Sequence, residues 1–141
     1  MTSDYIVGLI DGEGSFTVYV RNPNDETPRK RRVKVEPRFY VKLVAKDKIV
    51  LDDLKKFFGC GNVYFQSDKR ENHQDCYRFE VAKRSDLMDK IIPFFRKHKL
   101  KFPSKRKDFD IFCKIVSEIS KKKHLTQKDL AYLYNLKSEM H

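Results

Sequence analysis

The chain alternates between two hydrophobic periods, and each change of period marks the start of a new predicted element. Residues 4–12 carry an apolar stretch that predicts a helix. Residues 15–21 and 32–44 then alternate apolar and polar side chains one by one, which predicts two strands. The polar segment 22–28 between them contains Asn, Asp and two prolines, and it predicts a loop.

A helix followed by two strands is predicted a second time in the middle of the chain. Residues 47–58 return to helical spacing, and Gly59 is the residue expected to stop this helix. Residues 62–67 and 75–81 alternate again and predict a second hairpin.

The last third of the chain is predicted to be helical. A helix is expected to start with Ser85 as its N-cap and to be kinked by Pro93. Two further helices are expected over residues 105–120 and 127–139, the second of which opens with a sequence similar to a capping box. The residues expected to be buried by the first of these three helices are Met88, Ile91, Ile92 and Phe95.

The resulting order, α-β-β-α-β-β-α-α, predicts an α+β fold. At 141 residues the chain has the length of one domain, so residues 1–141 are expected to fold as a single unit. Four strands with one apolar face need helices to cover that face, which predicts a curved antiparallel sheet with its other face open to solvent.

The side chains predicted on the open face are basic or form hydrogen bonds, which suits the reading of DNA bases. Two strands fit the major groove, where Arg pairs with guanine and Asn or Gln with adenine. Glu36 and Glu80 are expected on the same face, either to accept from cytosine or to pair with a neighbouring arginine. The residues expected to contact DNA, one of them between the first two strands, are Thr17, Tyr19, Arg21, Arg29, Arg32, Lys34, Arg38, Tyr40, Lys42, Asn62, Tyr64, Gln66 and Arg78.

Composition changes this picture in two ways. The net charge of +11 and the pI of about 9.6 indicate a polyanionic partner, and the acid-free basic run within residues 96–107 is expected to contact phosphates. The three cysteines are widely spaced, no signal peptide is apparent and no apolar run is long enough to span a membrane. We therefore expect an intracellular protein of a prokaryotic cytoplasm or an organelle matrix, not secreted and without a membrane partner.

Residues 6–14, Ile-Val-Gly-Leu-Ile-Asp-Gly-Glu-Gly, break two helix rules at once. Glycine inside a helix lowers the stability of the helix. An acid at the C-terminal end is also unfavourable, because it lies at the negative end of the macrodipole. Gly8 and Gly12 are four apart and share one face, which allows a second backbone to approach closely. Gly14 is expected to be a left-handed C-cap, and Glu13 to lie at the helix tip. The plainer alternative is a buried N-terminal helix with solvated acids.

This nonapeptide resembles the LAGLIDADG motif of homing endonucleases, with Gly8, Leu9, Ile10, Asp11 and Gly14 matching letter for letter. The resemblance extends over most of the chain. Further family-like features are Lys46-Asp47 with Leu51, the Phe58-Gly59-x-Gly61 turn, and the run from Pro103 to Lys107.

The resemblance implies a LAGLIDADG homing endonuclease fold and a site-specific enzyme, encoded in an intron, that cuts double-stranded DNA. A chain with one motif is implied to act as a homodimer on a near-palindromic target, cutting both strands across the minor groove to leave four-base 3′ overhangs. The implied interface residues are Ile6, Gly8, Leu9 and Gly12.

The resemblance also assigns the catalytic roles. Glu13 is implied as the metal-binding acid with the Gly12 carbonyl as a second ligand, for Mg²⁺ or for another divalent ion such as Mn²⁺ or Ca²⁺. Lys105 is implied beside the scissile phosphate, with Lys107 as the alternative.

One residue departs from the family pattern. Ala45 stands where many members have a glutamine that holds the nucleophilic water, so Lys46, Lys42 or solvent is expected to hold it. Two other functions on the same fold therefore remain open, an RNA-splicing maturase and a DNA-binding regulator that does not cut.

Overall fold

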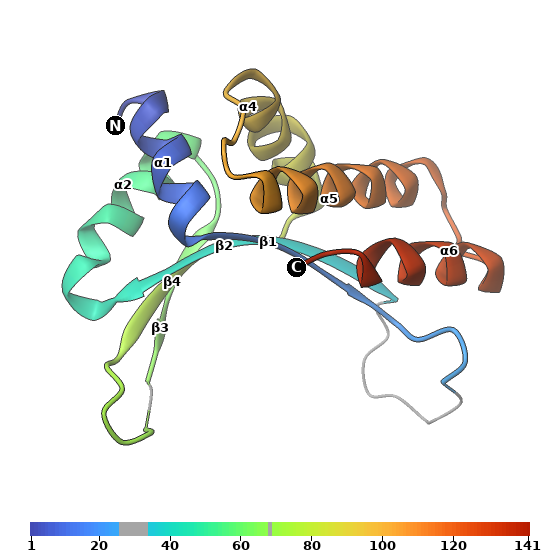
Figure 1. The fold of residues 1–141 in the computed structure, drawn as a ribbon, viewed down its shortest axis with the longest axis horizontal. Helices are drawn as coiled ribbons and strands as arrows, with labels where there is room; N and C mark the ends of the chain where they lie inside the picture. Colours follow the sequence, from blue (N-terminus) through green and yellow to red (C-terminus); the bar gives the residue numbers. More distant parts are fainter. Residues whose placement is uncertain (26–33, 68) are drawn as a thin grey trace.

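The computed structural model describes residues 1–25, 34–67 and 69–141, and it forms one sheet with helices on one side (Figure 1). Four antiparallel strands are hydrogen-bonded in the order β1-β2-β4-β3. This arrangement confirms the predicted α+β fold. The elements in chain order are α1 (Ser3–Glu13), β1 (Gly14–Val20), β2 (Val35–Val44), η1 (Ala45–Asp47), α2 (Lys48–Phe58), β3 (Asn62–Gln66), β4 (Cys76–Val81), α3 (Arg84–Asp86), η2 (Leu87–Ile91), α4 (Ile92–Lys97), α5 (Pro103–Lys121) and α6 (Gln127–Ser138).

The sheet is bent into an arch, and its convex side carries all the helices (Figure 1). Helices α5 and α6 pack over β1, while α2 packs over β4 and β2. The core lies between these layers and is rich in phenylalanine, because Phe16, Phe39 and Phe95 are almost completely buried. The ring centroids of Phe16 and Phe39 are 5.1 Å apart, and those of Phe39 and Phe95 are 5.8 Å apart. The concave side is therefore the face that the helices leave open.

The residue-by-residue alternation is confirmed in β1 and β2, whereas β3 does not follow it and leaves Phe65 55% exposed. In β1 every second residue from Gly14 to Val20 is buried, and β2 follows the same rule from Val35 to Val41. The register places Ser15 opposite Tyr40, so the polar sets of the two strands share the concave face.

The helix after β4 differs from its prediction. It begins at Arg84 rather than after an N-cap at Ser85, and it contains the π-helical stretch η2 immediately before α4. Pro93 is the second residue of α4 and directly follows this π-helical stretch, so it offers no N–H group to the preceding turn. The wider turn buries Leu87 and leaves Met88 at 42% exposure, so the predicted burial of Met88 is wrong.

Gly14 is needed for a different reason than the one predicted. Its backbone is extended, with φ −79° and ψ 155°, so the predicted left-handed cap is wrong. A Cβ atom at Gly14 would lie 2.5 Å from Cγ2 of Ile10 and 2.9 Å from the Ile10 carbonyl oxygen. Glycine therefore allows the chain to turn from α1 directly into β1 without a side chain colliding with the last helical turn.

The end of the chain matches its prediction more closely. Helix α6 opens with a complete capping box, in which Thr126 and Asp129 each bond the other's backbone N–H. Among the described helices, none combines the length and the apolar character that a membrane span requires.

Candidate functional site

Glu13 is the last residue of α1, and its side chain is exposed where the helix meets the sheet. It stands at the negative end of the helix dipole, where no basic residue of the last turn offsets its charge. A carboxylate held there is poorly placed for helix stability and well placed to bind a cation. The predicted position of Glu13 at the helix tip is confirmed.

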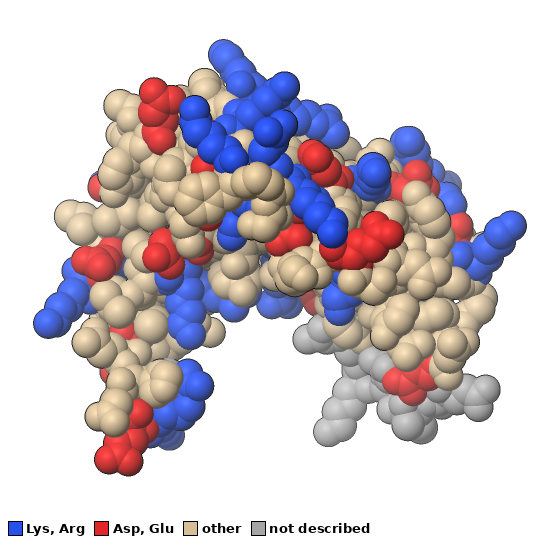
Figure 2. Space-filling model, viewed as in Figure 1, with Lys and Arg blue, Asp and Glu red and all other residues tan. Residues whose placement is uncertain are grey.

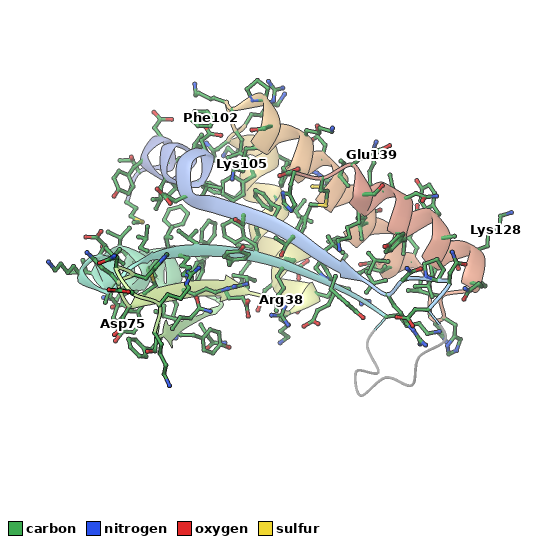
Figure 3. All side chains as sticks on the ribbon, turned by 60° about the horizontal axis from the view of Figure 1, so that its bottom comes forward. Arg38, Asp75, Phe102, Lys105, Lys128 and Glu139 are labelled. Carbon is green, nitrogen blue, oxygen red and sulfur yellow. The ribbon has the colours of Figure 1, made fainter. Side chains whose placement is uncertain are left out.

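Lys105 lies at the same junction, although it is about ninety residues away from Glu13 in the sequence. It lies in the first turn of α5, and its Nζ donates a hydrogen bond to the carbonyl oxygen of Gly14. Figure 3 shows Lys105 beside the C-terminal end of α1. The structure thus places one ammonium group next to the residue that follows Glu13.

Lys107 lies elsewhere on α5. Two residues along a helix correspond to a rotation of about 200°, so Lys105 and Lys107 point to different sides. Lys107 lines a surface hollow together with Pro103 and Glu139, and Glu139 is distant from Lys105 in Figure 3. The geometry therefore favours Lys105 over Lys107 at the Glu13 junction.

Asp11 connects the two helices of the site, and the sequence did not reveal this role. Only 4% of Asp11 is exposed, and its carboxylate accepts three backbone N–H bonds of 3.0–3.1 Å from Lys101 and Phe102. These residues directly precede Pro103, the first residue of α5. Asp11 therefore fixes the start of α5 against the end of α1, and so holds Lys105 close to Gly14.

One face of α1 is open in the single chain. A Cβ atom at Gly8 or Gly12 would meet no atom within 4 Å, and Tyr5 on the same helix is 52% exposed. Leu9 is half-buried beside this face. Ile6 is completely buried in the core of the single chain, so it adds no surface to this face. The open face consists of Tyr5, Gly8 and Gly12, with Leu9 at its border.

The acids of the described residues do not form a complete metal site in one chain. No group of three His, Cys, Asp or Glu side chains in residues 1–25, 34–67 and 69–141 could hold a metal ion. Glu13 provides one carboxylate, and Gly12 beside it leaves space around the backbone. Carboxylate and carbonyl oxygens are suitable ligands for a hard divalent cation that keeps several waters. The donor set thus fits part of the coordination shell of a hard divalent cation.

The concave face carries the polar residues that the alternation predicted. One row across the sheet runs through Ser15, Tyr40, Glu80 and Asn62, and the next runs through Lys42, Arg78 and Tyr64. Figure 2 shows this side as a hollow with basic side chains along its roof and one wall. The other described members of the predicted set, which lie on or next to this face, are Thr17, Tyr19, Arg21, Lys34, Arg38 and Gln66. Arg29 and Arg32 lie outside the described residues.

Both acids of the concave face pair with arginines. Glu36 and Glu80 each form an ion pair with Arg38, and Glu80 also pairs with Arg78 at 2.9 Å. The hydrogen bond from Arg38 to Glu36, more than any other interaction, raises the pKa of Arg38 above its ordinary value. Of the two roles considered for these acids, the free chain shows arginine pairing.

The basic run within residues 96–107 divides between two sides of the molecule. Arg96, Lys99 and Arg106 line a cavity of about 190 Å³ on the helical side, over the core residues Phe95 and Phe109. Lys and Arg side chains also gather at the top of Figure 2, opposite the hollow. Of this run, Lys105 is the residue that the structure joins to the Glu13 junction.

Ala45 follows β2 at the start of η1. Its N–H donates to the carbonyl of Asp75 at 2.9 Å. Val41 pairs with Gly14, so Ala45 lies four residues beyond that row, about 13 Å along the strand direction. Lys46, which follows it, is exposed.

Comparison with known proteins assigns the family. The model of the family described as LAGLIDADG endonuclease matches residues 6–116. A relative from Mycosarcoma maydis, "Probable intron-encoded DNA endonuclease 1", is 32% identical over 111 residues, which are 79% of this chain and 35% of that protein. The chain thus spans about a third of this relative's length.

Solved structures agree with this assignment. The homing endonuclease I-TnaI is 37% identical, with a TM-score of 0.80 over 100% of this chain and 88% of the other. I-SmaMI, bound to an uncleaved DNA target with calcium ions, is 31% identical, with a TM-score of 0.82 over 100% of this chain and 45% of the other. This chain belongs to the LAGLIDADG endonuclease family.

Proposed function

We propose that the chain is a site-specific endonuclease that cuts double-stranded DNA, of the intron-encoded homing type, and that it acts as a homodimer. The observation that carries this proposal is the junction of Glu13 and Lys105, set at the end of a helix whose glycine face is open. A second copy of α1 on that face would bring a second Glu13 close to the first. The similar homing endonuclease I-TnaI supports this proposal, because this chain covers 88% of it and the two chains are therefore of similar size.

The duplex is proposed to lie in the concave hollow. The two strand pairs present arginine, tyrosine, asparagine and glutamine side chains in cross-strand rows, which suits recognition of base edges in the major groove. DNA-bound I-SmaMI and I-GzeII are among the similar structures. A two-fold dimer reads two equivalent half-sites, so the target is proposed to be near-palindromic.

The chemistry is proposed to be metal-assisted hydrolysis across the minor groove, leaving four-base 3′ overhangs. Glu13 and the Gly12 carbonyl would hold Mg²⁺, which supplies an activated water and neutralises charge at the phosphate. Lys105 would offer a positive charge to the oxygens of the scissile phosphate. Asp11 keeps Lys105 in place by binding the backbone of residues 101 and 102, which directly precede α5.

The first test is cleavage of a randomised duplex library with Mg²⁺, followed by sequencing of the cut ends. Discrete cuts with four-base 3′ overhangs at one near-palindromic sequence are expected. Salt-sensitive binding to duplex DNA without cutting would indicate the regulator, and binding to structured intron RNA alone would indicate the maturase. In either case Ala45→Gln is the change expected to restore cutting if the missing water ligand is the cause.

The role of Glu13 is tested by Glu13→Gln. The amide keeps the shape of the side chain and removes its charge, so metal-dependent cleavage is expected to fall at least a hundredfold while duplex affinity changes less than threefold. Asp4→Asn, at the other end of the same helix, is the matched control and is expected to cut normally. Cleavage retained in Glu13→Gln would exclude Glu13 from the reaction.

A further inference from the structure

Two acids stand on the concave surface that we propose faces the DNA duplex, and their placement there is unfavourable for affinity. Glu36 and Glu80 lie on the concave side of β2 and β4, and their side chains are 25% and 14% exposed. Each carboxylate repels a polyanion and cancels one of the positive charges beside it. A basic surface designed for affinity alone would omit them.

The acids form a chain of alternating charges with two arginines. Arg38 donates to Glu36 through one terminal nitrogen and to Oε1 of Glu80, at 3.5 Å, through the other. The same Oε1 of Glu80 lies 2.9 Å from Arg78. The order is therefore Glu36, Arg38, Glu80 and Arg78, running from β2 to β4.

Arg78 is also held by an aromatic ring. Its guanidinium carbon lies 3.5 Å from the centroid of Tyr40, which is a cation–π arrangement. Its Nε is buried and has no hydrogen-bond partner. The guanidinium is thus fixed by Glu80 at its outer end and by Tyr40 over its plane, with little freedom to turn.

Fixing an arginine in this way favours base reading over phosphate contact. A free arginine loses much side-chain entropy when it binds, whereas a held guanidinium has lost part of it already. The nitrogens of Arg38 and Arg78 share one oxygen, at 3.5 and 2.9 Å, and so lie at most about 6.4 Å apart, less than two base-pair steps of ~3.4 Å. Donors at this separation are close enough to reach neighbouring base pairs.

We propose that Glu36 and Glu80 are specificity-determining positioning residues, which hold Arg38 and Arg78 to read two neighbouring base pairs and withhold them from backbone phosphates. Arginine in such a site pairs with guanine through O6 and N7. The acids thus lower affinity for every sequence and increase the difference between sequences. This inference rests on the proposed function, because it requires duplex DNA in the concave hollow.

The test is a duplex-binding selection with the 141-residue chain in Ca²⁺. It measures the base preference at every position together with the salt dependence of affinity. Glu80→Gln is expected to reduce the preference at least tenfold at the Arg78 position and to a smaller extent at the Arg38 position, because Glu80 pairs with both arginines. Glu36→Gln is expected to reduce the preference at least tenfold at the Arg38 position. Each released arginine becomes available to a phosphate, so the slope of log K against log salt should steepen by about one. Asp53→Asn, on the exposed side of α2, removes the same charge and is expected to change neither quantity.

The possible results separate the inference from the proposed function. Wild-type chain that selects no duplex sequence would overturn the proposed function. Wild-type chain that selects a sequence, with both glutamine variants keeping its preference and its slope, would overturn the inference alone. Thermal unfolding identifies a variant that does not fold. The other variant then decides the test, because Arg38 is held by both acids and Arg78 by Glu80.

Discussion

Asp11 and Glu13 are two acids of one motif, yet the structure gives them opposite surroundings. Asp11 is buried and accepts three backbone N–H bonds from the loop before α5, while Glu13 is exposed and faces the open end of the site. The first therefore organises the site, and the second is available for chemistry. Of these two acids, only Glu13 is placed to hold a metal ion at the reacting phosphate.

Asp11→Asn tests the organising role. The amide places an NH2 group where the carboxylate oxygen lies 3.0 Å from the Lys101 nitrogen, so donor faces donor, and the remaining oxygen loses its negative charge. The weakened hydrogen bonds are expected to cost about 1–3 kcal/mol in the free energy of unfolding. The loosened α5 loop should also lower the single-turnover cleavage rate while leaving duplex affinity within threefold. Urea unfolding and single-turnover kinetics measure the two effects, with Asp4→Asn as the control. Unchanged stability and rate would show that the three hydrogen bonds do not organise the site.

For single residues, the sequence predicted which side chains are exposed at the candidate site better than it predicted which residues contact one another. The motif identified Glu13, and the spacing of glycines identified an exposed face. The role of Asp11 depends on residues 101 and 102, about ninety positions away, and no local pattern links them. The pairing of Glu80 with two arginines likewise depends on the strand register, which alternation alone does not determine.

Helix α1 uses its glycines in two different ways. Gly8 and Gly12 leave open space, whereas Gly14 lies against Ile10 with no room for a side chain. Sequence spacing predicted the open face correctly. The predicted left-handed backbone at Gly14 was wrong. A close approach to a neighbouring turn and a left-handed backbone both require glycine, and a sequence does not distinguish the two.

Gly12→Leu separates folding from association. Nothing in the chain itself occupies the space of a Cβ at this position, and leucine favours the helix by almost 1 kcal/mol over glycine, so the variant is expected to fold with equal or greater stability. The proposed partner helix would be blocked, so the variant should be monomeric. Analytical ultracentrifugation and thermal unfolding measure the two properties. A dimer that persists in Gly12→Leu would exclude this face as the interface.

The capping box of α6 is expected to make the stability of the protein depend on pH. The ammonium of Lys122, followed by the bonds from Thr126, lowers the pKa of Asp129 to about 2. A depressed pKa means that this stabilisation is complete above the ordinary value of 3.8 and is lost as pH falls toward 2. In thermal unfolding the difference between wild type and Asp129→Asn should therefore shrink as pH falls from 5 to 2. A difference that stays constant over this range would contradict the assigned role of the carboxylate.

In the whole molecule, the fold places the excess of Lys and Arg side chains both on the helical side and on the concave face of the sheet. The run within residues 96–107 is continuous in sequence, but α4, its loop and α5 carry most of it to the helical side, away from the hollow. Sequence reasoning could predict a basic protein and a basic sheet face. It could not predict that a single run would be divided, because the division depends on how α5 packs across β1.

Salt dependence of duplex binding tests this division. Lys42→Ala, on the concave face, is expected to weaken the slope of log K against log salt by about one, since one phosphate contact is lost. Lys99→Ala removes the same charge from the helical side and is expected to leave the slope unchanged. Equal effects of both substitutions would show that the duplex also reaches the helical side.

The incomplete metal site of the single chain has a consequence for how the protein behaves at low abundance. Each chain provides one Glu13 and one open helix face, so on the proposed assembly an isolated chain cannot cut. When chains are scarce, the number of competent pairs grows with the square of their number. A cell making few copies would then be almost free of strand breaks, and a modest rise in expression would produce a disproportionate onset of cutting.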